Sequence, residues 1–351
     1  MFCPSGVTMA RPRYCPATIL MGPPLDRPGS QCNGRRMSNV GFSITIPAYI
    51  LVAAEEARRS PLIANVRPIA RWKGLAGFIA FSLVLMFAVS IVIALAIAFI
   101  AAMGVAQAST LGPVPEGPDR LYGEVVFVLE LGAVLGLLAG AVLLSAKVAY
   151  RAPMTAFLWP GRLFAQKQLW LGFAVMAAVG SASVVIYNLI DPAGAAPILN
   201  PAYSIESRLF YVAAAALGLF VAAAAEEVVF RGVLLRVTGG FTSSLLILCL
   251  FNALVFSAVH LDPDPAAFVA RAMSGLVWAW AALRLGGLEF SIGAHWAGNL
   301  VIALLGEPLS SEPPPGEVVP LSVLAYEGVA MIVVLIVVEH IARSRRVQVS
   351  A

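Results

Sequence analysis

Charged residues are scarce in this chain. Of its 351 residues only 12% are charged, while 60% are hydrophobic; a soluble globular domain typically has about 25% charged residues. A soluble enzyme of this size would need a polar surface, so the composition excludes that class of protein. The 23 basic residues exceed the 19 acidic ones by too few to indicate a nucleic-acid-binding surface.

Cysteines with metal-ligand spacing are also absent. Three of the four cysteines, Cys3, Cys15 and Cys32, lie in the polar N-terminal region, and Cys249 lies in an apolar run. No two of them form a CxxC or CxxxC pair. The sequence therefore indicates neither a disulfide framework nor a thiolate metal site.

Long apolar runs are the main feature that is present. We count eight of them, at roughly 75–103, 123–149, 168–190, 208–230, 244–260, 266–283, 290–306 and 320–341. Runs of this length with few charges predict membrane-spanning helices. The expected fold class is therefore all-α, a polytopic membrane protein with about eight transmembrane helices.

Basic residues gather at alternate ends of these runs. They precede the first run, surround the connection after the second and follow the last: Arg67, Arg71, Lys73, Lys147, Arg151, Arg162, Lys167, Arg343, Arg345 and Arg346. The other connections are mainly acidic. By the positive-inside rule both termini are predicted to be cytoplasmic, and we expect a multi-pass protein of a cell membrane.

The region before the first run differs in composition. Residues 1–66 are rich in Pro, Gly, Arg and Ser and contain no run long enough to cross a bilayer. We expect them to form a poorly ordered cytoplasmic extension, and Met37 is a second possible translation start. The membrane-embedded helical domain is predicted to cover residues 67–346, with the chemistry concentrated at about 205–305.

Three glycines at four-residue spacing lie in the second run. Gly132, Gly136 and Gly140 share one face of the predicted helix, which predicts close contact with another helix.

Two carboxylates and a guanidinium end the fourth apolar run. Each intramembrane charge costs about 3 kcal/mol on insertion scales, so three close together require partners or a function. Glu227 and Arg231 are four residues apart with the acid first, the favourable order for an ion pair on a helix. Glu226 points about 100° away around the helix. We expect Arg231 to neutralise Glu227 and leave Glu226 facing a cavity.

Two of the three histidines lie in nearby apolar runs. Phe256 and His260 are four residues apart at the end of the fifth run, and His295 and Asn299 have the same spacing in the seventh. The third histidine, His340, follows Glu339 at a basic helix end, where a helix-dipole contact explains it. A lone histidine is usually a packing residue, but two beside an acidic pair favour a functional site.

A carboxylate, two imidazoles and a carboxamide can form a hydrolytic site. A carboxylate removed from bulk water gains proton affinity and can take a proton from water. An imidazole can orient that water, and an amide NH₂ with an imidazole N–H can stabilise an oxyanion. Alternatively, both imidazoles and a carboxylate could bind zinc. The His-Glu-x-x-His motif of the commonest zinc proteases is absent.

The order and spacing of these motifs resemble a known family. Glu226-Glu227-x-x-x-Arg231, Phe256-x-x-x-His260 and His295-x-x-x-Asn299 are similar to the motifs of the type II CAAX prenyl endopeptidases and their bacterial relatives, the CPBP or Abi family. The resemblance covers about residues 205–305. It implies an intramembrane endopeptidase in which Glu226 and His260 activate water and His295 and Asn299 form the oxyanion hole. Glu227, Arg231 and Phe256 would support them.

The resemblance leaves the cofactor and substrate open. Descriptions of the family differ on whether catalysis depends on glutamate alone or on a metal; a zinc ion would take Glu226, His260 and His295. The expected partners are the lipid bilayer and a membrane-anchored protein or peptide, prenylated or not, with no nucleic acid.

The depth of His260 tests this interpretation. If every run simply crossed the bilayer, His260 would lie far from Glu226. We therefore predict that the fourth and fifth helices extend past the membrane on the cytoplasmic side. His260 would then lie near mid-depth within about 10 Å of Glu226, a reach set by one bridging water, and residues 261–265 would form irregular backbone.

Two functions of other classes compete with the endopeptidase. A proton-coupled transporter could use Glu226, Glu227 and the histidines as a relay, with Glu130 of the second run as a further member. A catalytically silent immunity or interaction protein could use the same scaffold.

Overall fold

A computed structural model describes residues 47–64, 71–103, 114, 120–190, 196, 198–306 and 320–350. The chain divides into two units, Met1–Glu55 and Glu56–Ala351. Within the predicted N-terminal extension, the described residues form α1 (Ala48–Arg58) and α2 (Pro61–Ala64). Residues 1–46 and Arg67 lie outside the described residues, and the boundary at residue 66 stays a prediction.

All eight apolar runs form helices, and the regular structure of the described ranges is entirely helical. The helices are α3 (Arg71–Ala102), α4 (Arg120–Tyr150), α6 (Gln166–Ile190), α7 (Ile205–Glu227), α9 (Leu245–Ala258), α10 (Pro265–Leu285), α11 (Glu289–Leu305) and α12 (Leu321–Ser350). A short helix, α5 (Thr155–Leu158), precedes α6. The predicted all-α, multi-pass membrane fold is confirmed.

Six of these helices are long and apolar enough to span a membrane: α3, α4, α6, α7 with its continuation to Gly239, α10 and α12. The other two are shorter, with 14 residues in α9 and 17 in α11. A bilayer core about 30 Å thick needs about 20 residues of helix. Among the described residues six helices therefore meet this criterion. The prediction of about eight spans and the side on which the termini lie stay predictions.

Local signals set the helix ends. The hydroxyls of Ser204 and Ser244 accept from backbone N–H groups in the first turns of α7 and α9. Asp264 caps α10 in the same way, with Pro265 as its first residue. Gly286, at φ 70°, ends α10 in the left-handed conformation that favours glycine.

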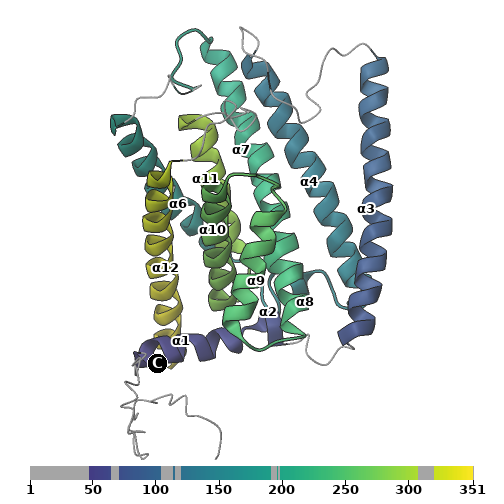
Figure 1. Cartoon of the computed structure of the whole chain (residues 1–351), viewed down its shortest axis with the longest axis vertical. Helices are drawn as coiled ribbons and strands as arrows, with labels where there is room; N and C mark the ends of the chain where they lie inside the picture. The colour runs from purple at the N-terminus through teal and green to yellow at the C-terminus, as the bar shows by residue number, and fades with distance from the viewer. Residues whose placement is uncertain are drawn as a thin grey trace, which may run out of the picture. The chain divides into compact units, whose positions relative to one another are not determined.

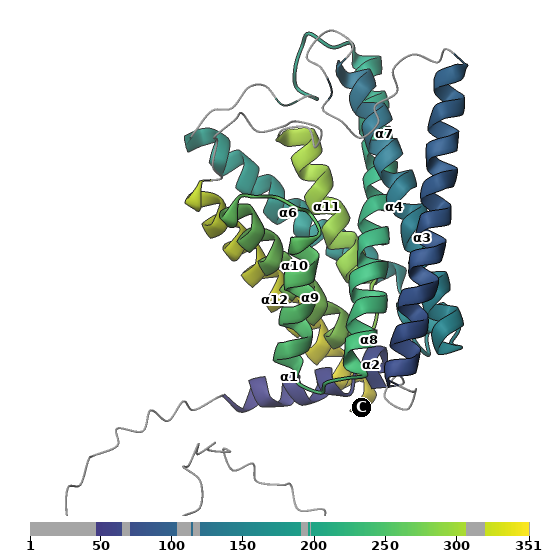
Figure 2. The ribbon, with the colours of Figure 1, turned by 45° about the vertical axis from the view of Figure 1, so that its right-hand side comes forward.

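The second unit is built around α7 and α11. α11 packs against α6 on one side and α7 on the other, α4 lies between α7 and α3, and α10 contacts both α9 and α12 (Figures 1 and 2). The connection between α9 and α10 lies lower in both views than the upper ends of α7 and α11. The end of α9 is therefore brought beside the middle of its neighbours.

Two of the three predicted packing glycines contact α7. A Cβ on Gly132 would lie 2.5 Å from the carbonyl oxygen of Gly218, and one on Gly136 would lie 3.0 Å from Val221. Gly140 has nothing within 4 Å of its Cβ position, so the prediction is wrong for that residue. A step of four residues rotates about 40° around a helix, so the third glycine has turned away from the contact.

Candidate active site

The acidic pair lies where the helix geometry changes. Glu226 and Glu227 end α7, and Val228–Leu234 continue as a π-helix, η1, before α8 (Leu235–Gly239). Segments of π-helix are rare and occur frequently at functional sites. The Asn252 side chain on α9 donates to the carbonyl oxygen of Phe230 at 2.6 Å. Sequence reasoning missed both features, although a buried amide in the apolar run of α9 was a usable signal for Asn252.

The predicted ion pair between Glu227 and Arg231 is present. Nη1 of Arg231 donates to Oε1 of Glu227 at 3.0 Å, and both side chains are fully buried. Nη2 of Arg231 also donates to the carbonyl oxygen of Gly275 on α10 at 3.2 Å. The guanidinium stacks 4.2 Å from the ring centroid of Phe256. Arg231 therefore neutralises Glu227 and joins η1 to α9 and α10.

His295 contacts Glu227 as well, which the sequence did not predict. Its Nδ1 lies 2.9 Å from Oε1 of Glu227. The guanidinium of Arg231 donates to the same oxygen. Oε1 of Glu227 therefore acts as an acceptor, and the imidazole carries a proton on Nδ1. Nε2 of His295 then points toward Glu226, with 3.8 Å between Nε2 and Oε2.

His260 is fixed in a similar orientation. It follows α9, and its Nδ1 lies 2.8 Å from the carbonyl oxygen of Phe256. A carbonyl only accepts, so Nδ1 is the protonated nitrogen and Nε2 of the neutral ring is an acceptor. That Nε2 lies 3.9 Å from Oε2 of Glu226. The prediction that His260 lies within 10 Å of Glu226 is confirmed. Residues 261–264 of the predicted irregular stretch 261–265 are non-helical, whereas Pro265 is the first residue of α10.

Glu226 lies between the two imidazoles without bonding to either. Its Oε2 is buried and has no hydrogen-bond partner, and the distances of 3.8 and 3.9 Å to the two Nε2 atoms exceed direct hydrogen bonds. Buried polar atoms are normally paired. Oε2 of Glu226 is therefore the atom at which a small polar group, such as a water molecule, would complete the hydrogen bonding of the cluster.

The ring of Phe256 packs against both imidazoles. Its ring centroid lies 5.0 Å from the ring of His260 and 5.9 Å from that of His295, both in edge-to-face orientation. Packing of this kind restricts both imidazoles and excludes water from one side of the cluster.

Asn299 was predicted to belong to the site, but the structure shows no hydrogen bond between its amide and the Glu226 cluster. It lies one turn after His295 on α11 and is half-buried, and its amide makes no hydrogen bond within the described part of the chain. Its place in an oxyanion hole stays a prediction.

The donor set is of a kind that zinc accepts, namely two imidazoles and a carboxylate. Each imidazole also donates its other N–H to an oxygen, as metal-bound histidines usually do. As the side chains stand, however, no group of three or more His, Cys, Asp or Glu residues in the described ranges has an arrangement that could hold a metal ion. Zinc binding by Glu226, His260 and His295 stays a prediction, and no catalytic step is derived through a metal.

A comparison with protein families matches the stretch that carries this cluster. Residues 208–301 match the family described as type II CAAX prenyl endopeptidase, Rce1-like. This match confirms the resemblance to the CPBP family. It covers α7, η1, α8, α9 and α10 and most of α11, and it supports a CAAX-protease-like hydrolase in an integral, multi-pass membrane protein.

One curated relative is similar over a shorter length. The uncharacterized protein YyaK of Bacillus subtilis (strain 168) is 32% identical over 119 residues, which cover 30% of this chain and 40% of the relative. The chain thus matches less than half of that relative's length. No solved structure gives a significant match to the chain.

Proposed function

We propose that this CPBP-family protein is an intramembrane endopeptidase that hydrolyses peptide bonds with a water held by Glu226 and His260. The observation that carries the proposal is the unpartnered Oε2 of Glu226, which faces Nε2 of His260 and Nε2 of His295. A water between Glu226 and His260 could donate one proton to each, which would aim its lone pair at a substrate carbonyl.

The proton transfers follow from these positions. As the water oxygen bonds to the carbonyl carbon, Glu226 takes its proton, and the C=O π electrons move to the oxygen. Glu226 then returns the proton to the amine nitrogen. The oxyanion electrons re-form the C=O bond as the C–N bond breaks, which gives a carboxylic acid and a free amine. The Nδ1–H of His260 stays hydrogen-bonded to the carbonyl oxygen of Phe256 throughout, and the ring acts by orienting the water.

The proposed oxyanion hole places a condition on His295. Its Nδ1 proton is held by Glu227, so Nε2 can donate to an oxyanion only when the ring carries both protons. The neighbouring Glu227 carboxylate would stabilise such an imidazolium. The Asn299 amide would supply the second donor.

The substrate is proposed to be a membrane-anchored protein or peptide. The site is built from helices of a multi-pass membrane protein, so a substrate segment in the bilayer reaches it most directly. The matching family is described as a CAAX prenyl endopeptidase, and assays with prenylated and unprenylated reporters would test for a prenyl requirement. The bacterial cell membrane is the proposed location.

Cleavage of a membrane-anchored reporter tests the proposal. Glu226→Gln keeps the size of the side chain and removes the base, so we expect cleavage to fall by at least about 100-fold. Glu130→Gln, which changes another membrane glutamate on α4, is the matched control and should cleave normally. Equal cleavage by Glu226→Gln and the unaltered protein would disprove the proposed role.

Two further measurements separate the alternatives. Comparing N-termini in the membrane proteome of cells with the unaltered protein and with Glu226→Gln would reveal the substrate. A transporter would show solute uptake without new peptide ends. Loss of cleavage with a chelator, restored by zinc, would favour the metal-assisted mechanism, and insensitivity to chelator would favour the metal-free one.

A further inference from the structure

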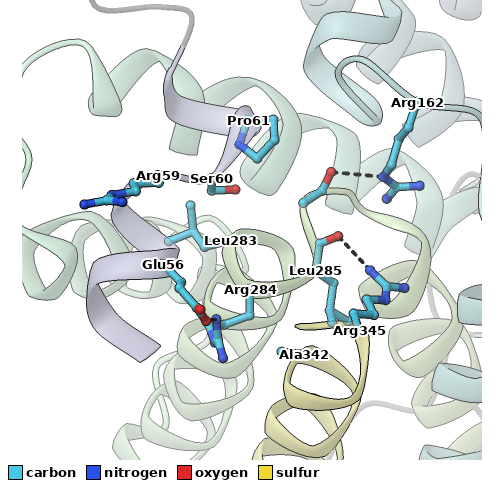
Figure 3. A pocket seen from close by; sticks show the side chains of 11 residues that line it. Glu56, Arg59, Ser60, Pro61, Arg162, Leu283, Arg284, Leu285, Ala342 and Arg345 are labelled. Atoms are coloured by element: carbon cyan, nitrogen blue, oxygen red, sulfur yellow. Dashed lines mark hydrogen bonds and ion pairs between the residues drawn. The ribbon is translucent and has the colours of Figure 1, made fainter. Parts of the chain in front are cut away.

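A second polar region lies at the other ends of the helices. A cavity of about 420 Å³ opens between the residues Glu56–Pro61, the last turn of α10 and the last turns of α12 (Figure 3). Four arginines line it, and Glu56 is its one acidic lining residue: the arginines are Arg59, Arg162, Arg284 and Arg345. The volume lies within the range of small-ligand sites, and none of the lining residues belongs to the Glu226 cluster.

Two of these arginines, Arg162 and Arg284, are bonded to carboxylates. Arg162 binds Glu289 through two parallel bonds of 2.6 Å. Arg284 binds Glu339 at 2.7 and 2.8 Å and Glu56 at 2.8 Å. These ion pairs hold the two guanidinium groups in fixed positions at the wall of the cavity.

Arg345 differs from them. It donates to the carbonyl oxygen of Leu285 at 3.3 Å. The Gln168 amide, oriented with its oxygen toward the guanidinium, accepts from Nη1 at 3.1 Å and also from Nη2. Both partners are neutral, and in the described ranges no carboxylate pairs with Arg345. Glu289, which is bonded to Arg162, acts on Arg345 only through space. A bound anion would supply the direct counter-charge that this half-buried guanidinium lacks.

The cavity lies at the level where lipid headgroups are expected. Leu285 ends one candidate membrane span, Arg345 ends another, and Arg162 lies four residues before a third. In Figure 3 the Arg162 and Arg345 side chains lie on the same side of the cavity, bonded to the adjacent carbonyl oxygens of Gly286 and Leu285. Basic pockets between membrane helices bind anionic headgroups, and the planar fork of arginine fits phosphate oxygens.

We propose that this arginine pocket binds a phosphate-bearing anion, with Arg345 as its principal ligand. The phosphate could belong to an anionic phospholipid headgroup or be free inorganic phosphate. The position at the helix ends favours the lipid. The site is separate from the proposed hydrolytic centre, so its test does not depend on cleavage.

The test measures lipid binding to the purified full chain. Native mass spectrometry follows binding of phosphatidylglycerol added to the protein in detergent. We expect Arg345→Gln to weaken binding by about tenfold, because it removes a charge-assisted contact. The control Arg343→Gln removes the same charge from the same helix at an exposed residue outside the pocket, and should leave binding within about twofold.

A second variant leaves Arg345 in place. Ala342 also lines the cavity, and Ala342→Glu would supply a carboxylate that competes with the phosphate. We expect it to weaken binding as Arg345→Gln does. The thermal unfolding midpoint of each variant in phosphatidylcholine nanodiscs checks that it is folded.

A parallel arm identifies the source of the phosphate. Inorganic phosphate is added to the protein in phosphatidylcholine nanodiscs. A rise in the unfolding midpoint that Arg345→Gln abolishes assigns the pocket to free phosphate, whereas binding of phosphatidylglycerol alone assigns it to the lipid. Equal binding of both ligands by the unaltered protein, Arg345→Gln and Ala342→Glu would overturn the proposal.

Discussion

The Glu226 cluster and the arginine pocket each contain a polar group that the rest of the fold leaves without a matching partner, beside side chains such as Glu227 and Arg231 that are paired through one atom and unpartnered at another. In the cluster it is a carboxylate oxygen, Oε2 of Glu226, held between two imidazoles. In the pocket it is the Arg345 guanidinium, whose partners in the described ranges are neutral oxygens. Around both, the neighbouring charges are paired: Glu227 with Arg231, and Arg284 with Glu339. An apolar fold pairs the charges it buries, so the exceptions mark the places where a ligand or substrate completes the structure.

The two regions differ in how much solvent reaches the paired charges. Arg231 and Glu227 are both fully buried. Arg284 is 3% exposed, but its partners Glu339 and Glu56 are 19% and 36% exposed. A charge left alone in the cluster would stay desolvated, whereas one left alone in the pocket could be hydrated. The same substitution should therefore have different effects in the two regions.

Replacing the paired arginine in each region gives the largest expected effect. Arg231→Met leaves the buried Glu227 without its counter-charge, and we expect the free energy of unfolding to fall by about 3–5 kcal/mol. Arg284→Met should cost only about 1–2 kcal/mol, because its partners can take up water. Unfolding in mixed micelles with increasing denaturing detergent would measure both.

A matched control is available on α7. Among the described residues, Arg208 bonds to the carbonyl oxygens of Ser204 and Ile198. Arg208→Met should cost less than about 1 kcal/mol. The proposed difference in solvation would be wrong if Arg284→Met destabilised the protein as much as Arg231→Met.

The next effect concerns cleavage rather than stability. His260→Ala removes the group proposed to orient the water, and we expect cleavage of the membrane-anchored reporter to slow by about 100-fold. Because the side chain is 30% exposed and follows the end of α9, the unfolding midpoint should change little. His340→Ala alters an exposed histidine on α12 and is the control. Comparable losses in both variants would show that histidine content, not the position beside Glu226, matters.

Much of the cluster could be predicted because its residues are close together in the sequence. The four-residue spacing of Glu227 and Arg231 predicts their ion pair, and the same spacing places Phe256 beside His260. We could also predict that the separate motifs meet at one depth, because an acid and two histidines in apolar runs need polar partners. The contact between His295 and Glu227 could not be predicted, because it depends on how α11 rotates against α7.

Other features depend on backbone geometry that the sequence does not specify. The π-helix after Glu227 has no residue pattern that distinguishes it from an ordinary turn of helix. The arginine pocket joins residues as distant as Arg59 and Arg345, and the sequence shows its arginines only as basic flanks of apolar runs. Likewise, four-residue spacing predicted a contact for Gly140 that the rotation of α4 removes.

The smallest expected effect tests whether the two regions act independently. The proposed roles require Arg345 for anion binding and not for hydrolysis, because its contacts are with Leu285 and Gln168 rather than with the Glu226 cluster. In phosphatidylcholine nanodiscs, where anionic lipid is absent, Arg345→Gln should change the rate of reporter cleavage by less than about twofold.

Adding phosphatidylglycerol to the nanodiscs separates two cases. If the pocket only anchors the protein, cleavage by the unaltered protein and by Arg345→Gln will respond equally. A response confined to the unaltered protein would instead show that the anion bound at the ends of α10 and α12 influences catalysis, and would contradict the independence of the two regions.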